Sequence, residues 1–364
     1  MTTRLILHAG SHKTGTTAIQ QALFQHRSSF AKAGILYDPG HRFFGGPKTA
    51  HHGLAHALAR FEAADRAALA RYRKMLDSRA QDANLVVISA EPFLRHIAAQ
   101  SGAGDRAGQR LAYVARVAEY LQGFDVTVSI YLRRPDRFAA SLYKENLVRT
   151  GLSMPFADYL VAKADTFHYQ SRLAPFRQHF TSVDVRSYEA TVARGLVRGF
   201  FEDHGLPLSP DFQEDRTRGS ISAAGAIWLA RAKSGGNISE RDRQRRWDFL
   251  LSPEAQEILA DPAGAGLWTG SEQRRSFVGA ALAGFDLAGF WDSPQEPVPP
   301  VDWNDIRQAK TDAAYRDWLH RNAARLKARE ALGAAPYQPD ISLPPARFML
   351  LRRYFGALGA ISRD

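Results

Sequence analysis

The segment Arg4–Phe24, RLILHAGSHKTGTTAIQQALF, decides the fold. It begins with an apolar run at residues 5–7, which suits a short buried strand and is too short for a helix. A tight loop follows at residues 10–15, and from Thr16 the apolar residues recur on one face at helical spacing. A strand, a glycine-containing loop and a helix in this order predict an anion site, because the first N–H groups of a helix lack backbone partners and the helix dipole favours negative charge there.

The position of the lysine distinguishes this loop from a Walker A loop. Gly10 and Gly15 have the spacing of the two Walker glycines, but a Walker lysine would directly follow the second one. Here Thr16 follows Gly15, and the lysine, Lys13, lies inside the loop. The sequence therefore predicts a phosphate loop of another kind, with one cation and several hydroxyl donors.

The string GSHKTGTT resembles the 5′-phosphosulfate loop of the sulfotransferase family, usually written PKxGTT, with His12 where the family more often has proline. That family binds 3′-phosphoadenosine 5′-phosphosulfate (PAPS), so the resemblance implies PAPS as co-substrate. It also implies a set of loop residues that bind the phosphosulfate: Ser11, His12, Lys13, Thr14, Gly15, Thr16 and Thr17.

A second strand is predicted at residues 84–89, and it leads into Glu91 and Pro92. Ligands of open α/β sheets bind at the carboxyl ends of strands, so Glu91 is placed where a general base could act. In sulfotransferases a His or Glu at the end of an early strand takes the acceptor's proton, and the resemblance nominates Glu91. The alternative is a carboxylate that only stabilises a helix start before Pro92. His51 and His52 are the reserve candidates, since histidine is a common base near neutral pH.

A third strand is predicted at residues 126–132, followed by Arg133 and Arg134. An arginine at a strand end and a serine two turns into the next helix can converge on one phosphate. This arrangement resembles the second sulfotransferase signature, the 3′-phosphate site, in which the arginine precedes the serine by eight residues. That spacing selects Arg133 with Ser141 and leaves Arg134 at the helix start. A paired-arginine surface turn is the alternative for the segment.

Two later segments carry weaker resemblances. A strand is predicted at residues 183–189, and Tyr188 matches the family's tyrosine that contacts the adenine; a buried tyrosine with a satisfied hydroxyl is the alternative. Arg218 and Gly219 match loosely the basic, glycine-containing loop that many sulfotransferases close over the 3′-phosphate.

The alternation of strands and helices predicts an α/β fold with a mainly parallel central sheet flanked by helices, the P-loop-like sulfotransferase fold by resemblance, and a helical C-terminal part. We expect a PAPS-binding core at residues 1–207, a helical continuation at residues 208–292, and a Pro-rich break with a helical extension at residues 293–364.

Composition narrows the classes of function. The chain has 364 residues and no cysteine, which excludes disulfides, thiolate metal sites and cysteine nucleophiles. The net charge of +11 suits an anionic ligand, but the arginines are dispersed, which argues against a specific nucleic-acid partner. His52 and His56 have a metal-binding spacing without a third ligand nearby, so no metal is expected.

The sequence also indicates where in the cell the protein is expected to lie. No signal peptide and no apolar run of membrane-spanning length is evident, which predicts a cytoplasmic protein. The apolar and basic tail at residues 345–358 could lie on a membrane surface or dock on the protein or a partner.

The resemblance implies a sulfotransferase that moves a sulfuryl group from PAPS to a hydroxyl or amine, and carbohydrate, lipid and small phenol all stay open as acceptors. Two alternatives are a P-loop kinase of a small molecule that uses Mg-ATP, and a non-catalytic protein that binds an anion or a polysaccharide on the same fold.

Overall fold

The computed structural model describes residues 2–11, 13–99, 105–209, 211–214, 220–236, 238–261, 266–285, 291 and 308–331. The predicted site residues His12, Arg218 and Gly219 lie outside these ranges, as does the tail at residues 345–358. Within the described residues, no helix combines the length and the apolar character needed to cross a membrane.

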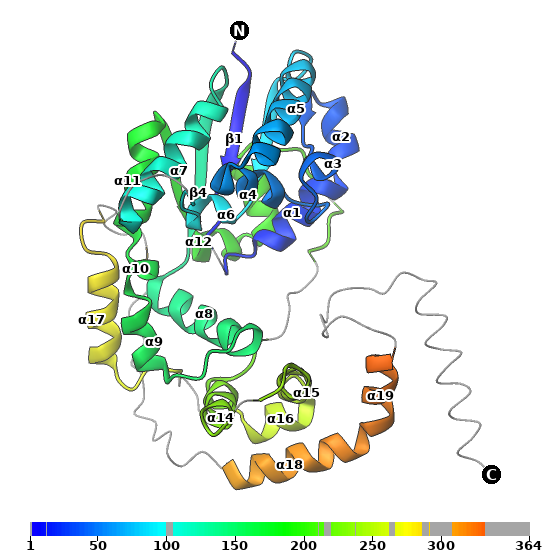
Figure 1. Ribbon diagram of the computed structural model, residues 1–364, viewed down its shortest axis with the longest axis vertical. Helices are drawn as coiled ribbons and strands as arrows, with labels where there is room; N and C mark the ends of the chain where they lie inside the picture. Colours follow the sequence, from blue (N-terminus) through cyan, green and yellow to red (C-terminus); the bar gives the residue numbers. More distant parts are fainter. Residues whose placement is uncertain are drawn as a thin grey trace, which may run out of the picture. The chain divides into compact units, whose positions relative to one another are not determined.

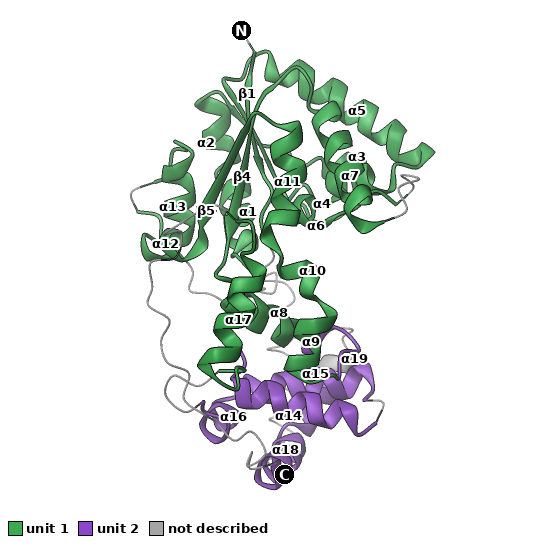
Figure 2. Cartoon of the chain, turned by 90° about the vertical axis from the view of Figure 1, so that its left-hand side faces the viewer, with its two compact units in different colours: residues 1–146, 154–214, 264–301 green, residues 147–153, 215–263, 302–364 purple. Residues whose placement is uncertain are grey.

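Two compact units make up the chain (Figure 2). Unit 1 comprises residues 1–146, 154–214 and 264–301, and unit 2 comprises residues 147–153, 215–263 and 302–364. The units are interleaved along the sequence, whereas the sequence suggested three consecutive segments.

Unit 1 contains a five-stranded sheet in the order β2-β3-β1-β4-β5, in which every pair of neighbouring strands is parallel. The strands are β1 (Arg4–His8), β2 (Ile35–Leu36), β3 (Leu85–Ser89), β4 (Asp125–Leu132) and β5 (Ser182–Ser187). The predicted α/β class with a parallel central sheet flanked by helices is therefore confirmed (Figure 1). β1 and β3 are almost wholly buried, which explains their continuous apolar runs.

The helices of unit 1 lie between successive strands or, for α12, α13 and α17, after the last strand (Figure 1). They are α1 (Thr16–Gln25), α2 (Arg27–Lys32), α3 (His41–Phe44), α4 (His52–Arg60), α5 (Ala63–Ala80), α6 (Pro92–Arg95), α7 (Arg106–Tyr120), α8 (Pro135–Arg149, whose last turn enters unit 2), α9 (Phe156–Ala162), α10 (Ala164–Phe167), α11 (Tyr169–His179), α12 (Tyr188–Ala193), α13 (Leu196–Asp203) and α17 (Ser271–Ala281).

One face of the sheet packs against α1, α2 and α13. The core there joins Ile6 of β1 and Val87 of β3 to Leu23 of α1, Phe30 of α2 and Phe200 of α13, all at most 4% exposed. Figure 2 shows α7 and α11 on the opposite side of the sheet from α2 and α13. The sheet is thus covered on both faces, as all-parallel sheets require.

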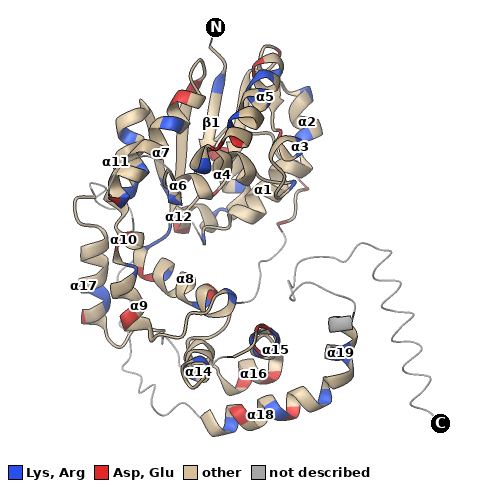
Figure 3. Ribbon diagram, viewed as in Figure 1, with Lys and Arg blue, Asp and Glu red and all other residues tan. Residues whose placement is uncertain are grey.

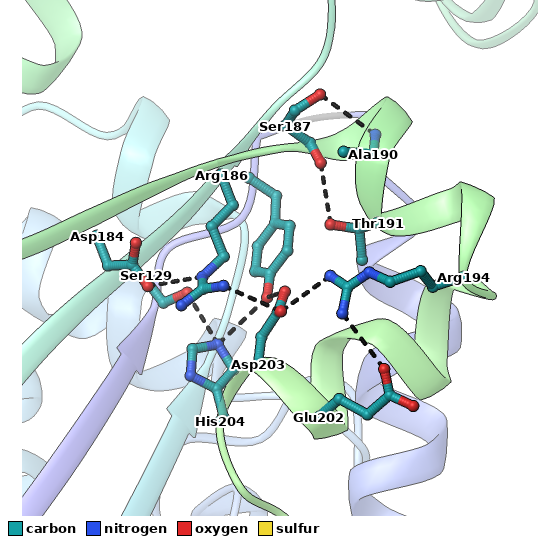
Figure 4. A network of polar contacts seen from close by, with 11 residues as sticks. Ser129, Asp184, Arg186, Ser187, Ala190, Thr191, Arg194, Glu202, Asp203 and His204 are labelled. Carbon is teal, nitrogen blue, oxygen red and sulfur yellow. Dashed lines mark hydrogen bonds and ion pairs between the residues drawn. The ribbon is translucent and has the colours of Figure 1, made fainter. Parts of the chain in front are cut away.

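A buried polar network fastens α13 to the sheet (Figure 4). The Asp203 carboxylate accepts a hydrogen bond from Tyr131 Oη at 2.9 Å and pairs with Arg186 at 3.0 Å and Arg194 at 2.9 Å. Beside it, His204 Nε2 lies 3.0 Å from Ser129 Oγ. Because these contacts join α13 to β4 and β5, they fix the helix that packs on the Gly15 loop.

The predicted strand at residues 183–189 ends two residues early. β5 stops at Ser187, whose hydroxyl accepts a hydrogen bond from the Ala190 N–H and caps α12. Tyr188 and Glu189 therefore begin a helix and do not end a strand, because a serine at this position offers the backbone a helix start.

Unit 2 is helical, with α14 (Ala223–Ser234), α15 (Glu240–Leu250), α16 (Pro253–Ile258), α18 (Gln308–Arg321) and α19 (Ala323–Ala331). Trp228 is fully buried and donates its indole N–H to Asp312 at 2.8 Å. Lys233 donates to three carbonyl oxygens, those of Leu147, Thr150 and Leu152, at 2.6–2.8 Å. The lysine thereby holds the last turn of α8 and the segment that follows it in place.

Candidate functional site

The crevice of the sheet lies between β1 and β4. The chain leaves β1 toward β2 on one side, and it leaves β4 toward β5 on the other side. Ligands of open α/β sheets bind where neighbouring strands send their connections in opposite directions. The loop after β1 and the residues after β4 are the segments that border this crevice.

The loop after β1 presents the start of α1 without a side-chain cap. Gly15 is the N-cap residue in the left-handed conformation, with φ 65°, and has no side chain that could cap the helix. The described part of that turn also carries no acidic residue. Thr14 turns its hydroxyl back to the Ser11 carbonyl at 2.6 Å, which tightens the loop. The start of α1 therefore offers backbone N–H groups to an anion at the loop, beside the Glu91 carboxylate that accepts a hydrogen bond from the Thr16 hydroxyl.

Both loop glycines are required by close contacts. A Cβ at Gly10 would lie 2.2 Å from Thr16 Cγ2, and one at Gly15 would lie 2.1 Å from Leu196 Cδ2. Gly15 also has a backbone conformation that side chains rarely adopt. The loop thus owes its close approach to α1 and α13 to the missing side chains.

Lys13 adopts a left-handed conformation with φ 67°, uncommon for a residue with a side chain. Its ammonium lies 3.5 Å from the Glu145 carboxylate of α8, and Lys13 is one-third exposed. Its carbonyl accepts a hydrogen bond from Arg133 Nη1 at 3.2 Å. The strained residue is held by α8 on one side and by the end of β4 on the other, a pattern typical of functional loops.

Arg133 contacts this loop directly, and Ser141 lies on α8, the helix whose Glu145 contacts Lys13. The Arg133 guanidinium also lies over the Tyr188 ring, 5.4 Å from its centroid, and burial raises the pKa of Tyr188. Ser141 is four residues before Glu145 on α8, so both share one face of the helix. Since Glu145 contacts Lys13, that face is turned toward the loop.

Arg134 has a different role from its neighbour. Its guanidinium is buried and makes a two-pronged contact with Asp136, at 2.7 and 2.9 Å. Its backbone N–H donates to the Glu189 carboxylate. Arg134 is thus committed to the start of α8, where the sequence had put it.

Glu91 and the phosphate loop meet through Thr16. Thr16 Oγ1 donates to Glu91 Oε2 at 3.0 Å, across the neighbouring strands β1 and β3. Glu91 is the N-cap residue of α6, but its side chain makes no cap hydrogen bond there. The carboxylate is therefore directed toward the loop and does not serve as a helix cap.

The two alternative candidates for the general base, His51 and His52, differ in their exposure to solvent. His51 is fully buried, its Nδ1 accepts from the Ser89 N–H at 3.1 Å, and burial lowers the pKa of His51 to about 4, opposed by Asp38. His52 begins α4 and is partly buried. His56, one turn further on, pairs with His96 at 2.8 Å, and no group of three metal-ligating side chains occurs among the described residues.

Two residues near the loop escaped the sequence analysis. His8, at the end of β1, is fully buried with Nδ1 2.8 Å from Ser89 Oγ. Burial, reinforced by His204 and opposed by Glu91, lowers the pKa of His8 to about 3. Glu145 is the other; its position one turn after Ser141 is the signal that could have found it.

Comparisons with known proteins give one result to set beside this geometry. No protein-family model matches the chain, and no curated protein matches it. Among solved structures, the chain is similar to a sulfotransferase from Alicyclobacillus acidocaldarius, with 18% identity and a TM-score of 0.35, over 64% of this chain and 93% of that one. At this TM-score the similarity carries no argument, so the fold rests on the parallel sheet itself and the function on the residues around its crevice.

Proposed function

We propose that the protein is a PAPS-dependent sulfotransferase that moves a sulfuryl group to a hydroxyl or amine of its acceptor. The observation that carries the proposal is the convergence of three segments far apart in sequence. Lys13 is bonded to Arg133 through its carbonyl, and Thr16 is bonded to Glu91. A phosphate loop, a phosphate-binding arginine and a carboxylate base are the parts that sulfuryl transfer from PAPS needs.

We assign a role to each of these residues from the resemblance to sulfotransferases, and the contacts between them support the assignment. The N–H groups of the first turn of α1, with Lys13, would hold the 5′-phosphosulfate and stabilise charge on the leaving phosphate. Arg133 and Ser141 would bind the 3′-phosphate, and Tyr188, whose ring faces Arg133, would contact the adenine. When the nucleotide binds, Lys13 would leave the Glu145 carboxylate and contact the nucleotide instead, because the carboxylate and the nucleotide are both anionic.

In the reaction, the acceptor oxygen or nitrogen attacks sulfur in line with the bond to the leaving phosphate. The new bond to sulfur forms as the sulfur–oxygen bond to the phosphate breaks, and adenosine 3′,5′-bisphosphate leaves. Glu91 accepts the acceptor's proton. As in phosphoryl transfer, positioning and charge stabilisation supply most of the catalysis.

A thermal-shift comparison tests the proposal. Adenosine 3′,5′-bisphosphate and Mg-ATP are each titrated into the wild type, Lys13→Ala and the control Lys32→Ala, which changes an exposed lysine of α2. A ligand at 100 times its Kd adds about 2.7 kcal/mol to the free energy of unfolding, which raises Tm by several degrees. We expect a shift with the bisphosphate in the wild type and the control, and its loss in Lys13→Ala.

Other outcomes would decide against the proposal. A shift with Mg-ATP alone would indicate the small-molecule kinase. No shift with either nucleotide would favour the non-catalytic anion-binding protein. A bisphosphate shift that survives Lys13→Ala would remove the loop from the nucleotide site.

A further inference from the structure

Arg172 is a buried cation that makes no direct hydrogen bond or ion pair with the residues that the structure describes. It lies in the first turn of α11 and is 8% exposed. No hydrogen bond or ion pair joins its guanidinium to any residue that the structure describes, and its Nε is fully enclosed. Burial, with Arg110 as the second cause, lowers the pKa of Arg172 to about 10. Burying a charge without a partner is costly, so a partner is needed to account for it.

Positive charge is in excess around this residue. Arg110 of α7 is 2% exposed and Arg106 is two-thirds exposed, and both pair with Asp165 of α10, at 3.2 and 3.6 Å. Asp165 is half exposed and also acts on Arg172 over a longer distance. Three guanidinium groups thus share one carboxylate. Arg110 and Arg172 are the buried members of the cluster, and Arg106 and Asp165 are its exposed members.

The cluster lies at the edge of the sheet that carries the candidate site. α7 precedes β4 and α11 precedes β5, so both helices start at the carboxyl ends of the parallel strands (Figure 1). Tyr169, three residues before Arg172, donates its hydroxyl to the carbonyl of Arg133. The cluster is therefore one aromatic side chain away from the proposed 3′-phosphate site. Figure 3 shows lysine and arginine positions spread along many helices of the ribbon, so basic residues are not confined to this cluster.

We propose that Arg172 and Arg110 form a second oxyanion site, separate from the phosphate loop, which receives the acidic group of the acceptor. A carboxylate, or a sulfate or phosphate ester, would bind the two guanidinium groups and balance their charge. The acceptor is then an acidic molecule that carries a hydroxyl or amine. This assignment of the acceptor class rests on the proposed sulfuryl transfer, whereas the oxyanion site itself does not.

The binding test uses sodium sulfate as the probe, with sodium chloride at equal ionic strength as reference. Tm is measured for wild type, Lys13→Ala, Arg172→Met and the control Arg177→Met, an exposed arginine of the same helix. Sulfate at ten times its Kd should raise Tm by roughly 2–4 °C. We expect the shift to persist in Lys13→Ala and Arg177→Met and to vanish in Arg172→Met. Without sulfate, Arg172→Met should melt no lower than wild type, because the variant removes an unpaired buried charge.

A full sulfate shift in Arg172→Met would overturn the site. A shift abolished by Lys13→Ala alone would do the same, because sulfate would then bind only the loop. A strong fall of Tm in sulfate-free Arg172→Met would also overturn it, since Arg172 would then have a structural role. Loss of the nucleotide shift with an intact Arg172-dependent sulfate shift would remove the proposed transferase function and keep the site.

The acceptor test compares molecules that differ only in an acidic group. Sulfuryl transfer is measured to 4-hydroxyphenylacetate against tyrosol, and to methyl β-D-glucuronide against methyl β-D-glucoside. We expect kcat/KM at least about tenfold higher for an acidic member, and in Arg172→Met a raised KM with kcat preserved. Equal rates within both pairs, or no transfer to any of the four while sulfate binding depends on Arg172, would assign the site to a free inorganic anion and withdraw the acceptor class.

Discussion

The carboxylate of Glu91 accepts a hydrogen bond from Thr16, the first residue of α1. This contact orients the proposed base toward the position where the acceptor would approach the sulfuryl group. Glu91→Gln keeps the shape and the contact and removes only the ability to accept a proton. We expect kcat to fall by about 10²–10⁴-fold, the usual contribution of a general base. The Kd of adenosine 3′,5′-bisphosphate should change little, since Glu91 makes no proposed contact with it.

Steady-state kinetics and nucleotide titration on the same preparations check this prediction. Glu119→Gln, on the exposed side of α7, is the matched control and should leave both constants unchanged. If Glu91→Gln keeps its kcat while a substitution of His51 or His52 lowers it, one of those histidines is the base.

Substitutions of the neighbouring residues Arg133 and Arg134 should have different effects. The first should weaken nucleotide binding, and the second should lower the free energy of unfolding. Arg133 reaches the loop through the Lys13 carbonyl, so Arg133→Ala should raise the Kd of the bisphosphate by tenfold or more and lower Tm little. Arg134 is buried against Asp136, so Arg134→Ala leaves a buried carboxylate with its main partner removed. We expect a loss of about 3 kcal/mol in the free energy of unfolding.

Calorimetric titration and urea unfolding of both variants measure the two effects. Equal effects of the two substitutions on Kd would show that the eight-residue spacing to Ser141 does not select Arg133. A large loss of stability in Arg133→Ala would give that residue a structural role instead.

At the scale of elements, the junction of β1 and α1 depends on the space that Gly10 leaves. Gly10→Ala would place a methyl group 2.2 Å from Thr16 Cγ2, so the loop must move or α1 must shift. We expect lower stability and weaker bisphosphate binding. Thr16→Ser removes that Cγ2 and keeps the hydroxyl that contacts Glu91. The double variant should therefore recover part of the loss, although His8 Nε2, at 3.3 Å from the added methyl, limits the recovery.

The double-mutant cycle is measured by urea unfolding, and the coupling energy between the two substitutions is the decisive quantity. A favourable coupling of about 1 kcal/mol or more is expected for two residues in direct contact. Additive effects would mean that the loop relaxes without pressing on Thr16.

The elements that the sequence predicted are those with a local signal. The strand at residues 84–89 was recognisable because both its faces are buried and its apolar run is continuous, and the strand at residues 126–132 because it is rich in β-branched and aromatic residues. The end of β5 was missed because Ser187 fits both a strand and a helix cap, and its bond to the Ala190 N–H decides between them.

The candidate site likewise contains residues with a local sequence signal and residues without one. Residues of the loop at residues 10–15 could be proposed from their spacing. The contacts between Lys13 and Glu145 and around Arg172 depend on helices brought together from distant parts of the chain. Nothing in the local sequence of Arg172 distinguishes it from the exposed Arg177 five residues later. Burial, which creates the proposed oxyanion site, is a property of the packed molecule.

At the scale of the whole molecule, three buried histidines link folding to pH. Burial lowers the pKa of His8 to about 3 and those of His51 and His204 to about 4, from 6.5. The folded state therefore holds these rings neutral, and below pH 6.5 the unfolded state binds more protons than the folded state. Stability must then fall as the pH falls from 6.5 toward the folded pKa values.

Each of the three histidines lowers the free energy of unfolding by about 1.4 kcal/mol per pH unit in this window. Together they remove roughly 6 kcal/mol at pH 5, comparable with the whole stability of many domains. We therefore expect the urea midpoint to be flat from pH 8 to 7 and to fall steeply between pH 6.5 and 4.5. His204→Gln can still bond to Ser129 but cannot titrate, so its pH slope should be smaller by about one proton.

The exposed His41 of α3 supplies the control, because His41→Gln replaces a histidine that lies outside the core. Its pH slope should match the wild type. A urea midpoint that stays constant down to pH 5 would contradict the burial of these rings as neutral groups. A slope that His204→Gln and His41→Gln reduce equally would mean that α13 does not hold His204 against the sheet in solution.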